Sequence, residues 1–236
     1  MRFNWGKILL VVILIFSIGV FYASNMKNNS RIINKIHVKI TPNSSYFISA
    51  DSIQNSINKY ILTSKDSISL SRIEQEIDKN TYIEKSQVYM KIGQELNVDI
   101  KQKEPIARVI TSDSVFYLDK NSNFMSLSKL KSSNVPVVFG FNENSDLKYL
   151  TEISLMIKED EFLNKSISQI FIKDDQKIDL KMRGNNTIIQ FGNNKRLINK
   201  IQNLKAFYNR TISKNEIDKY KKINLQFENQ VVVVKK

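Results

Sequence analysis

The stretch VYMKIGQELNVDI, residues 88–100, decides the fold of the first part of the chain. Apolar and polar residues alternate on both sides of Gly93-Gln94, which is the two-residue period of strands that bury one face. A glycine at the centre suits the tight turn of a β-hairpin. The sequence therefore predicts an antiparallel hairpin. Its apolar face holds Val88, Met90, Ile92, Leu96, Val98 and Ile100.

The residues that precede this hairpin predict a strand followed by a helix. Residues 36–40 alternate between apolar and polar and predict a half-buried strand, and residues 41–44 have the composition of a turn. Ser49 or Asp51 can cap the helix that follows. Its apolar residues recur at helical spacing, at Ile53, Ile57, Tyr60 and Ile61.

A second short helix is predicted before the hairpin. Ser71 and Glu74 have the spacing of a capping box, which marks a helix N-terminus. The block over residues 33–104 is therefore expected to have the order β-α-α-β-β, with two helices on a three-stranded sheet. A block of this size is long enough to fold alone, with limited stability.

The N-terminal stretch 8–22 is the most apolar part of the chain. Twelve of its fifteen residues are Leu, Ile, Val or Phe. At about −0.3 to −0.6 kcal/mol each, they favour membrane insertion by roughly 4–7 kcal/mol. The sequence predicts one transmembrane helix over residues 8–23, between a short tail of residues 1–7 and a polar linker of residues 24–32.

A cleavable signal peptide is the alternative for this stretch. Its cleavage site needs small residues at positions −3 and −1. Cleavage after Ala23 would place Phe21 at −3, and cleavage after Asn25 would place a polar residue at −1. An uncleaved anchor is therefore favoured, and the nearly equal basic flanks leave its orientation open.

The remaining residues, 105–236, predict a mixed sheet with two helices, so the chain as a whole is of the α+β class. Helical spacing of apolar residues predicts helices over 147–157 and 197–208. Short β-branched runs predict strands at 106–110, 115–118, 135–138, 167–172, 177–182, 187–191, 223–227 and 231–234. Turns are expected at 174–175, 184–186 and Asn229.

The composition excludes much enzyme chemistry. The 236 residues include no cysteine and one histidine, His37, which rules out thiol nucleophiles, disulfides and any site that needs two histidines. The net charge of +13 comes mainly from lysine, with only seven arginines. Because arginine is the residue suited to bidentate phosphate and base contacts, nucleic-acid binding is disfavoured. We expect no enzymatic activity, no cofactor and no metal.

Two acidic clusters are the only candidates for acid–base chemistry or cation binding. They are Glu159-Asp160-Glu161 and Asp174-Asp175. Neither has a histidine partner or a calcium-loop glycine, so a solvated helix end and a turn are the favoured interpretations. His37 is on the polar side of its strand and is expected at the surface.

Four motifs carry a family resemblance. They are QKEPIA at 102–107, FYLD at 116–119, VPVVFG at 135–140 and INLQFENQVV at 223–232. Their order behind a single anchor and a β-α-α-β-β block resembles the FtsQ/DivIB family of bacterial cell-division proteins. The resemblance implies a POTRA domain over residues 33–104 and a β domain over residues 105–236. Ser122 replaces a glycine common in relatives, which predicts a longer or differently shaped turn.

The resemblance also implies a function. In this family the C-terminal strands of the β domain bind the small single-span division proteins FtsB and FtsL, and the family has no catalytic role. The resemblance places the N-terminus in the cytoplasm and the bulk of the chain outside the cytoplasmic membrane at the division site. A second contact, through the strand edge at 36–40 or the helices of the POTRA domain, is expected with the septal cell-wall synthase or with other division proteins. The partner-binding residues that it implies are Tyr220, Ile223, Leu225, Phe227, Val231, Val232 and Val233.

Two other functions remain open at this point. A membrane-anchored chaperone or assembly factor of the POTRA type would use the same first block to hold unfolded β segments. An envelope hydrolase would need paired carboxylates in a pocket, with Glu159 or Asp175 as the residues to test.

Overall fold

The computed structural model of the chain describes residues 5–29, 33–41, 47–63, 69–184, 186–212, 217–228 and 230–236. Four predicted features lie partly or wholly outside them, namely the end of the linker at 30–32, residues 42–44 of the turn at 41–44, the middle of the turn at 184–186 and Asn229. Thr41, predicted as the first turn residue, is instead the last residue of a strand. The chain divides into two compact units, residues 1–102 and 103–236.

The first helix is longer than the sequence predicts. Helix α1 (Trp5–Asn29) contains the predicted helix over residues 8–23 and continues through residues 24–29, which were expected as linker. This extension holds no glycine or proline that would end a helix. Over the side chains that the structure describes, no helix is both long and apolar enough to cross a membrane, so the membrane span stays a prediction.

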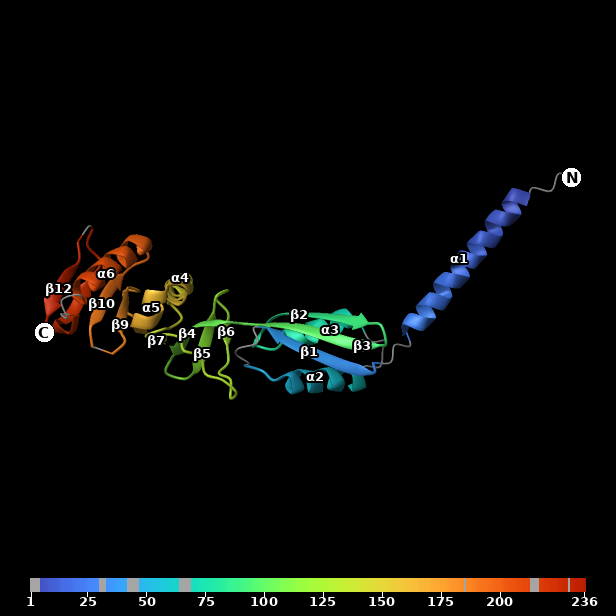
Figure 1. Cartoon of the computed structure of the whole chain (residues 1–236), viewed down its shortest axis with the longest axis horizontal. Helices are drawn as coiled ribbons and strands as arrows, with labels where there is room; N and C mark the ends of the chain where they lie inside the picture. The colour runs from blue at the N-terminus through green and yellow to red at the C-terminus, as the bar shows by residue number, and fades with distance from the viewer. Residues whose placement is uncertain are drawn as a thin grey trace. The chain divides into compact units, whose positions relative to one another are not determined.

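The first unit has the predicted β-α-α-β-β order. Its elements are β1 (Lys35–Thr41), α2 (Ala50–Thr63), α3 (Leu70–Asp78), β2 (Ile83–Lys91) and β3 (Glu95–Gln102) (Figure 1). The strand order is β1-β3-β2, with β1 parallel and β2 antiparallel to β3. The predicted hairpin is present, but Lys91 pairs with Glu95, so its turn has three residues, 92–94, instead of Gly93-Gln94 alone. Gly93 and Gln94 both have positive φ, 95° and 62°.

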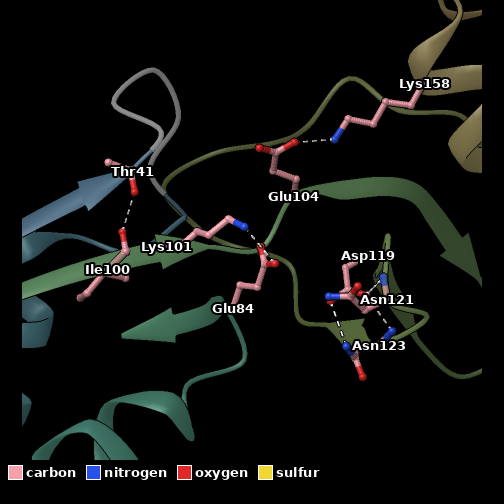
Figure 2. A network of polar contacts seen from close by, with 9 residues as sticks. All are labelled: Thr41, Glu84, Ile100, Lys101, Glu104, Asp119, Asn121, Asn123 and Lys158. Carbon is pink, nitrogen blue, oxygen red and sulfur yellow. Dashed lines mark hydrogen bonds and ion pairs between the residues drawn. The ribbon is translucent and has the colours of Figure 1, made fainter. Parts of the chain in front are cut away.

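One face of this sheet is covered by the two helices. Apolar residues of all three strands form a cluster with Ile53 and Ile57 of α2 and Ile73 and Ile77 of α3. The sheet is tied at its end by the Thr41 hydroxyl, which donates to the Ile100 carbonyl at 3.1 Å (Figure 2). The core is the one that the alternating apolar residues predict except at Ile92, which lies in the turn between β2 and β3 and is fully exposed.

The helix caps in this unit confirm one prediction and correct another. Ser49 caps α2, since its hydroxyl accepts the Ser52 N–H at 3.1 Å. The predicted capping box of Ser71 with Glu74 is wrong, because α3 begins at Leu70 and Ser71 is already inside the helix. The Glu74 carboxylate instead accepts the main-chain N–H of Val88 at 2.7 Å and joins α3 to β2.

The second unit contains one large mixed sheet and three helices among the described residues. Its strands are β4 (Pro105–Ile110), β5 (Val115–Asp119), β6 (Phe124–Met125), β7 (Val137–Phe139), β8 (Ile167–Ile172), β9 (Ile178–Met182), β10 (Ile188–Gly192), β11 (Tyr220–Asn224) and β12 (Val232–Lys235). Its helices are α4 (Leu147–Glu159), α5 (Glu161–Ser166) and α6 (Leu197–Ile212), with a 3-10 turn at Ile217–Lys219.

The nine strands lie in the order β12-β11-β10-β9-β8-β7-β4-β5-β6. Three neighbouring pairs are parallel, β10 with β11, β7 with β8 and β4 with β7, and the other five are antiparallel. Buried residues of the sheet and of the three helices form a single cluster. The α+β class is therefore confirmed, with a mixed sheet, while α5 and β6 are additional to the predicted elements.

The turn after β5 shows how the chain accommodates Ser122. The buried Asp119 carboxylate accepts the main-chain N–H groups of Asn121 and Asn123, each at 2.8 Å (Figure 2). This arrangement holds Ser122 at φ 62°, the left-handed conformation that glycine adopts most easily. The Ser122 hydroxyl lies 2.8 Å from that of Thr151 on α4, so the serine also has a side-chain contact that glycine lacks.

Candidate partner-binding edge

Strand β12 is the outermost strand at one end of the large sheet, and it has a neighbour on one side only within the described chain (Figure 1). It runs antiparallel to β11, with Asn224 opposite Val232 and Lys222 opposite Val234. The pairing has a bulge between Tyr220 and Lys222. The other edge of β12 can accept an incoming strand by main-chain hydrogen bonding.

The hydrogen bonds show which main-chain groups of β12 face outward. The Lys236 N–H donates to the Lys219 carbonyl across the strand pair at 2.9 Å. Main-chain groups alternate in direction along an antiparallel strand, so those of Val234 also face β11. The N–H and C=O groups of Val233 and Lys235 therefore face away from the sheet.

Three of the predicted partner-binding residues belong to the core. Ile223 is fully buried, Leu225 is 2% exposed, and Tyr220 packs its ring on Phe207 with the ring centroids 5.3 Å apart. The hydroxyl of Thr187 donates to the Tyr220 carbonyl at 2.8 Å and joins β11 to the segment before β10. In the folded unit these three side chains are buried beneath the sheet edge and are not exposed to a partner.

The predicted strand over 223–227 is placed too late in the sequence. The observed strand β11 ends at Asn224, and Phe227 lies beyond it in a bend with 48% of its surface exposed. Phe227 therefore does not continue the face formed by Ile223 and Leu225. It is an exposed aromatic side chain in the connection between β11 and β12.

The valines of β12 divide between two faces. Val231 and Val233 are partly buried and pack against the core, whereas Val232 and Val234 are 39% and 51% exposed. Val234 was not among the residues predicted to bind a partner, although the alternation of the run 231–234 places it with Val232. Lys222 lies opposite Val234 and is also exposed, so this face is both apolar and basic.

Arg196, just before α6, makes two contacts with the bend that contains Phe227; these contacts are called the brace below. The Arg196 guanidinium forms an ion pair with Glu228 at 3.3 Å and donates to the Gln226 carbonyl at 3.4 Å. Gly192 lies against the same bend, because a Cβ added there would be 2.8 Å from the Gln226 side chain. No sequence pattern indicated this brace, since its residues are about thirty positions apart.

The first unit has an open strand edge of its own. Strand β1 is outermost in its sheet, as the second predicted docking site requires. Lys35 and Lys39 are exposed along it, and charged residues are a common means of preventing edge-to-edge pairing. His37 is exposed, with its Nε2 3.5 Å from Glu95, as the sequence predicts for a surface histidine.

One aspartate of each acidic cluster, Asp160 and Asp175, has structural contacts. Asp160 ends α4 and caps α5, where its carboxylate accepts the Leu163 N–H at 3.0 Å and pairs with Lys205. Burial alone would raise the pKa of Asp160, but the hydrogen bonds from Lys205 and Leu163 outweigh it and hold that pKa below the usual value. Asp175 lies in an exposed turn, where Lys177 lowers its pKa. Among the described residues, no group of three metal-ligating side chains comes together.

The architecture defines a class of α+β protein in which a small three-stranded unit precedes a large mixed sheet with an open edge at β12. The family described as "FtsQ/DivIB, C-terminal related" matches residues 104–234, so the chain belongs to this family of cell-division proteins. None of the curated proteins compared with the chain matches it. Membership indicates a protein that works in cell division together with other division proteins.

Proposed function

We propose that the chain is a non-enzymatic scaffold of the bacterial division machinery that binds small single-span proteins resembling FtsB and FtsL. The observation that carries the proposal is the open edge of β12, with outward main-chain groups at Val233 and Lys235. Val232, Val234 and Phe227 supply exposed apolar surface beside it. Addition of a partner strand would satisfy the main-chain groups and cover these side chains.

The membrane part of the proposal rests on the apolar stretch at residues 8–22 and on the family. Anchoring by that stretch, with the bulk of the chain outside the cytoplasm at the division site, would place scaffold and partners in one membrane. Confinement raises their effective concentration, so individually weak contacts can hold an assembly together. Through these contacts the scaffold would link its partners to septal peptidoglycan synthesis. The single histidine and the absence of cysteine support a non-enzymatic role.

The test is co-purification of the tagged full chain from its native membranes, with bound proteins identified by mass spectrometry. The variant combines Val232→Asp with Val234→Asp, and Val115→Asp is the matched control because it is a 41% exposed valine on β5 of the same sheet. We expect the double variant to stay folded by circular dichroism and to lose small single-span partners, whereas the control keeps them. A folded double variant that recovers the same partners would refute this site.

A further inference from the structure

The second unit has an open groove between the end of α4 and the first turns of α6, on the helix side of the sheet. Its volume is about 360 Å³. Met156, Ile198 and Ile201 supply apolar lining, and Glu159, Asp160 and Lys205 supply charge. None of these residues belongs to the β12 edge.

The apolar lining combines buried and exposed surface. Ile201 is 8% exposed and belongs to the core, whereas Ile198 is 65% exposed at the second position of α6. A single exposed isoleucine is ordinary on a protein surface, but this one borders a groove with a buried apolar floor. The groove could cover an aliphatic side chain inserted between Ile198 and Met156.

The charges of the groove leave one carboxylate without an ion pair. Asp160 is neutralised by Lys205 and by its role as a helix cap, and Glu161 pairs with Lys165 at 2.6 Å. Glu159 forms no ion pair with any residue that the structure describes, and it is exposed at the groove. The groove therefore has one net negative charge in a chain whose net charge is +13.

We propose that this groove binds an amphipathic helix of a protein partner. One aliphatic side chain of that helix lies in the groove, and a lysine or arginine beside it pairs with Glu159. An apolar groove between helices suits a partner helix that inserts aliphatic anchors. Glu159 selects a cationic neighbour for that anchor through charge complementarity. The site is separate from β12 and does not depend on strand addition there.

The test uses the full chain in lipid nanodiscs and two fluorescein-labelled helical peptides, followed by fluorescence anisotropy. Both peptides carry a central leucine, with lysine four residues later in one and glutamate in the other, so that the two side chains share one helix face. An exposed ion pair is worth up to about a fivefold difference in affinity, so we expect the lysine peptide to bind about fivefold more tightly.

Three variants identify the groove as the binding site. Glu159→Lys should reverse the preference between the peptides, and Ile198→Asp should weaken both by at least about tenfold. Leu130→Asp is the matched control, because Leu130 is 62% exposed in the same unit and does not line the groove, and it should change neither affinity. Absence of binding by both peptides, or an unchanged preference in Glu159→Lys, would overturn the proposal. If both peptides bind equally and both lose binding in Ile198→Asp, the groove takes an uncharged apolar ligand, and the proposed occupant is overturned.

Discussion

Proline substitutions along β12 separate main-chain addition from side-chain docking. Proline has no N–H, so it removes one donor wherever it is placed. In Lys235→Pro the lost N–H is one that faces away from β11, and an outward position on an edge strand tolerates proline. In Val234→Pro the lost N–H faces β11, so the damage falls on the sheet itself.

The expected magnitudes follow from the hydrogen bond that each variant removes. In Lys235→Pro a partner carbonyl would lose its donor on binding, at a cost of about 1–3 kcal/mol. At about 2 kcal/mol the affinity for the partner falls roughly thirtyfold. The fold should change little, because the Lys235 side chain is exposed. In Val234→Pro a similar free energy is lost from the pairing of β11 with β12, and the partner is lost along with the strand.

The assay combines quantitative co-purification of the full chain with hydrogen exchange at the amides of Lys222 and Asn224, which lie opposite Val234 and Val232. We expect Lys235→Pro to retain protection of these amides and lose the partner, and Val234→Pro to lose both. If Lys235→Pro retains the partner at the wild-type level with β11 still protected, strand addition at this edge is refuted. The exposed side chains of Val232 and Phe227 would then have to account for binding.

Two further predictions concern the second unit. Gly140→Ala should lower the free energy of unfolding by roughly 3 kcal/mol, because φ at Gly140 is 79° and the new Cβ would be 2.1 Å from the Ile172 carbonyl oxygen. Gly184→Ala should lower it by only about 1 kcal/mol, because φ is similar at 82° but nothing lies within 4 Å of the new Cβ. Equal losses in thermal unfolding of the two variants would contradict the steric argument. Burial, with Arg196 nearby, lowers the pKa of Lys200 from 10.5 to about 8. Lys200 therefore binds its proton more tightly in the unfolded chain than in the folded one, so the free energy of unfolding should rise with pH between about 8 and 10.5. Urea unfolding at several pH values should show this rise in the wild type and a smaller one in Lys200→Met, and identical slopes would exclude Lys200 as its source.

Local composition predicted much of the large sheet. The strand predictions for residues 167–172, 177–182 and 187–191 agree within one residue with β8, β9 and β10. Short β-branched runs bounded by turn residues mark such consecutive strands along the sequence, which needs no knowledge of distant contacts. Strand order is different, because β7 lies between β4 and β8 through parallel pairings that leave no local mark.

The errors near the candidate site have a physical origin. The bulge between Tyr220 and Lys222 interrupts the two-residue period at the start of β11, so that start does not look like a strand. The apparent alternation through Phe227 does not mark a strand, because β11 ends at Asn224 and the chain bends at Phe227, where Arg196 contacts the neighbouring Gln226 and Glu228. Burial of Tyr220 depends on Phe207 of α6, a contact that the sequence alone does not indicate.

Helix α5 was missed for a related reason. The sequence around Asp160 looks like a helix that fades into a charged loop, and a single carboxylate that ends one helix and caps the next produces the same pattern. Lys205, which pairs with this carboxylate, is 45 residues away on α6. The sequence therefore shows that residues 159–161 are polar and acidic. That Asp160 ends one helix and caps the next is seen only in the tertiary structure.

The short strand β7 has a mechanical consequence for a protein that holds others together. It contains only three residues, Val137–Phe139, yet within the sheet it alone connects β4, β5 and β6 to the five strands that end at β12. Its register includes two residue pairs with β4 and three with β8. Of the tension applied between a partner at β12 and the start of β4, the share that is carried by the strand pairing would cross β7, where few hydrogen bonds hold the two parts of the sheet together, and the rest would be carried by the common hydrophobic core.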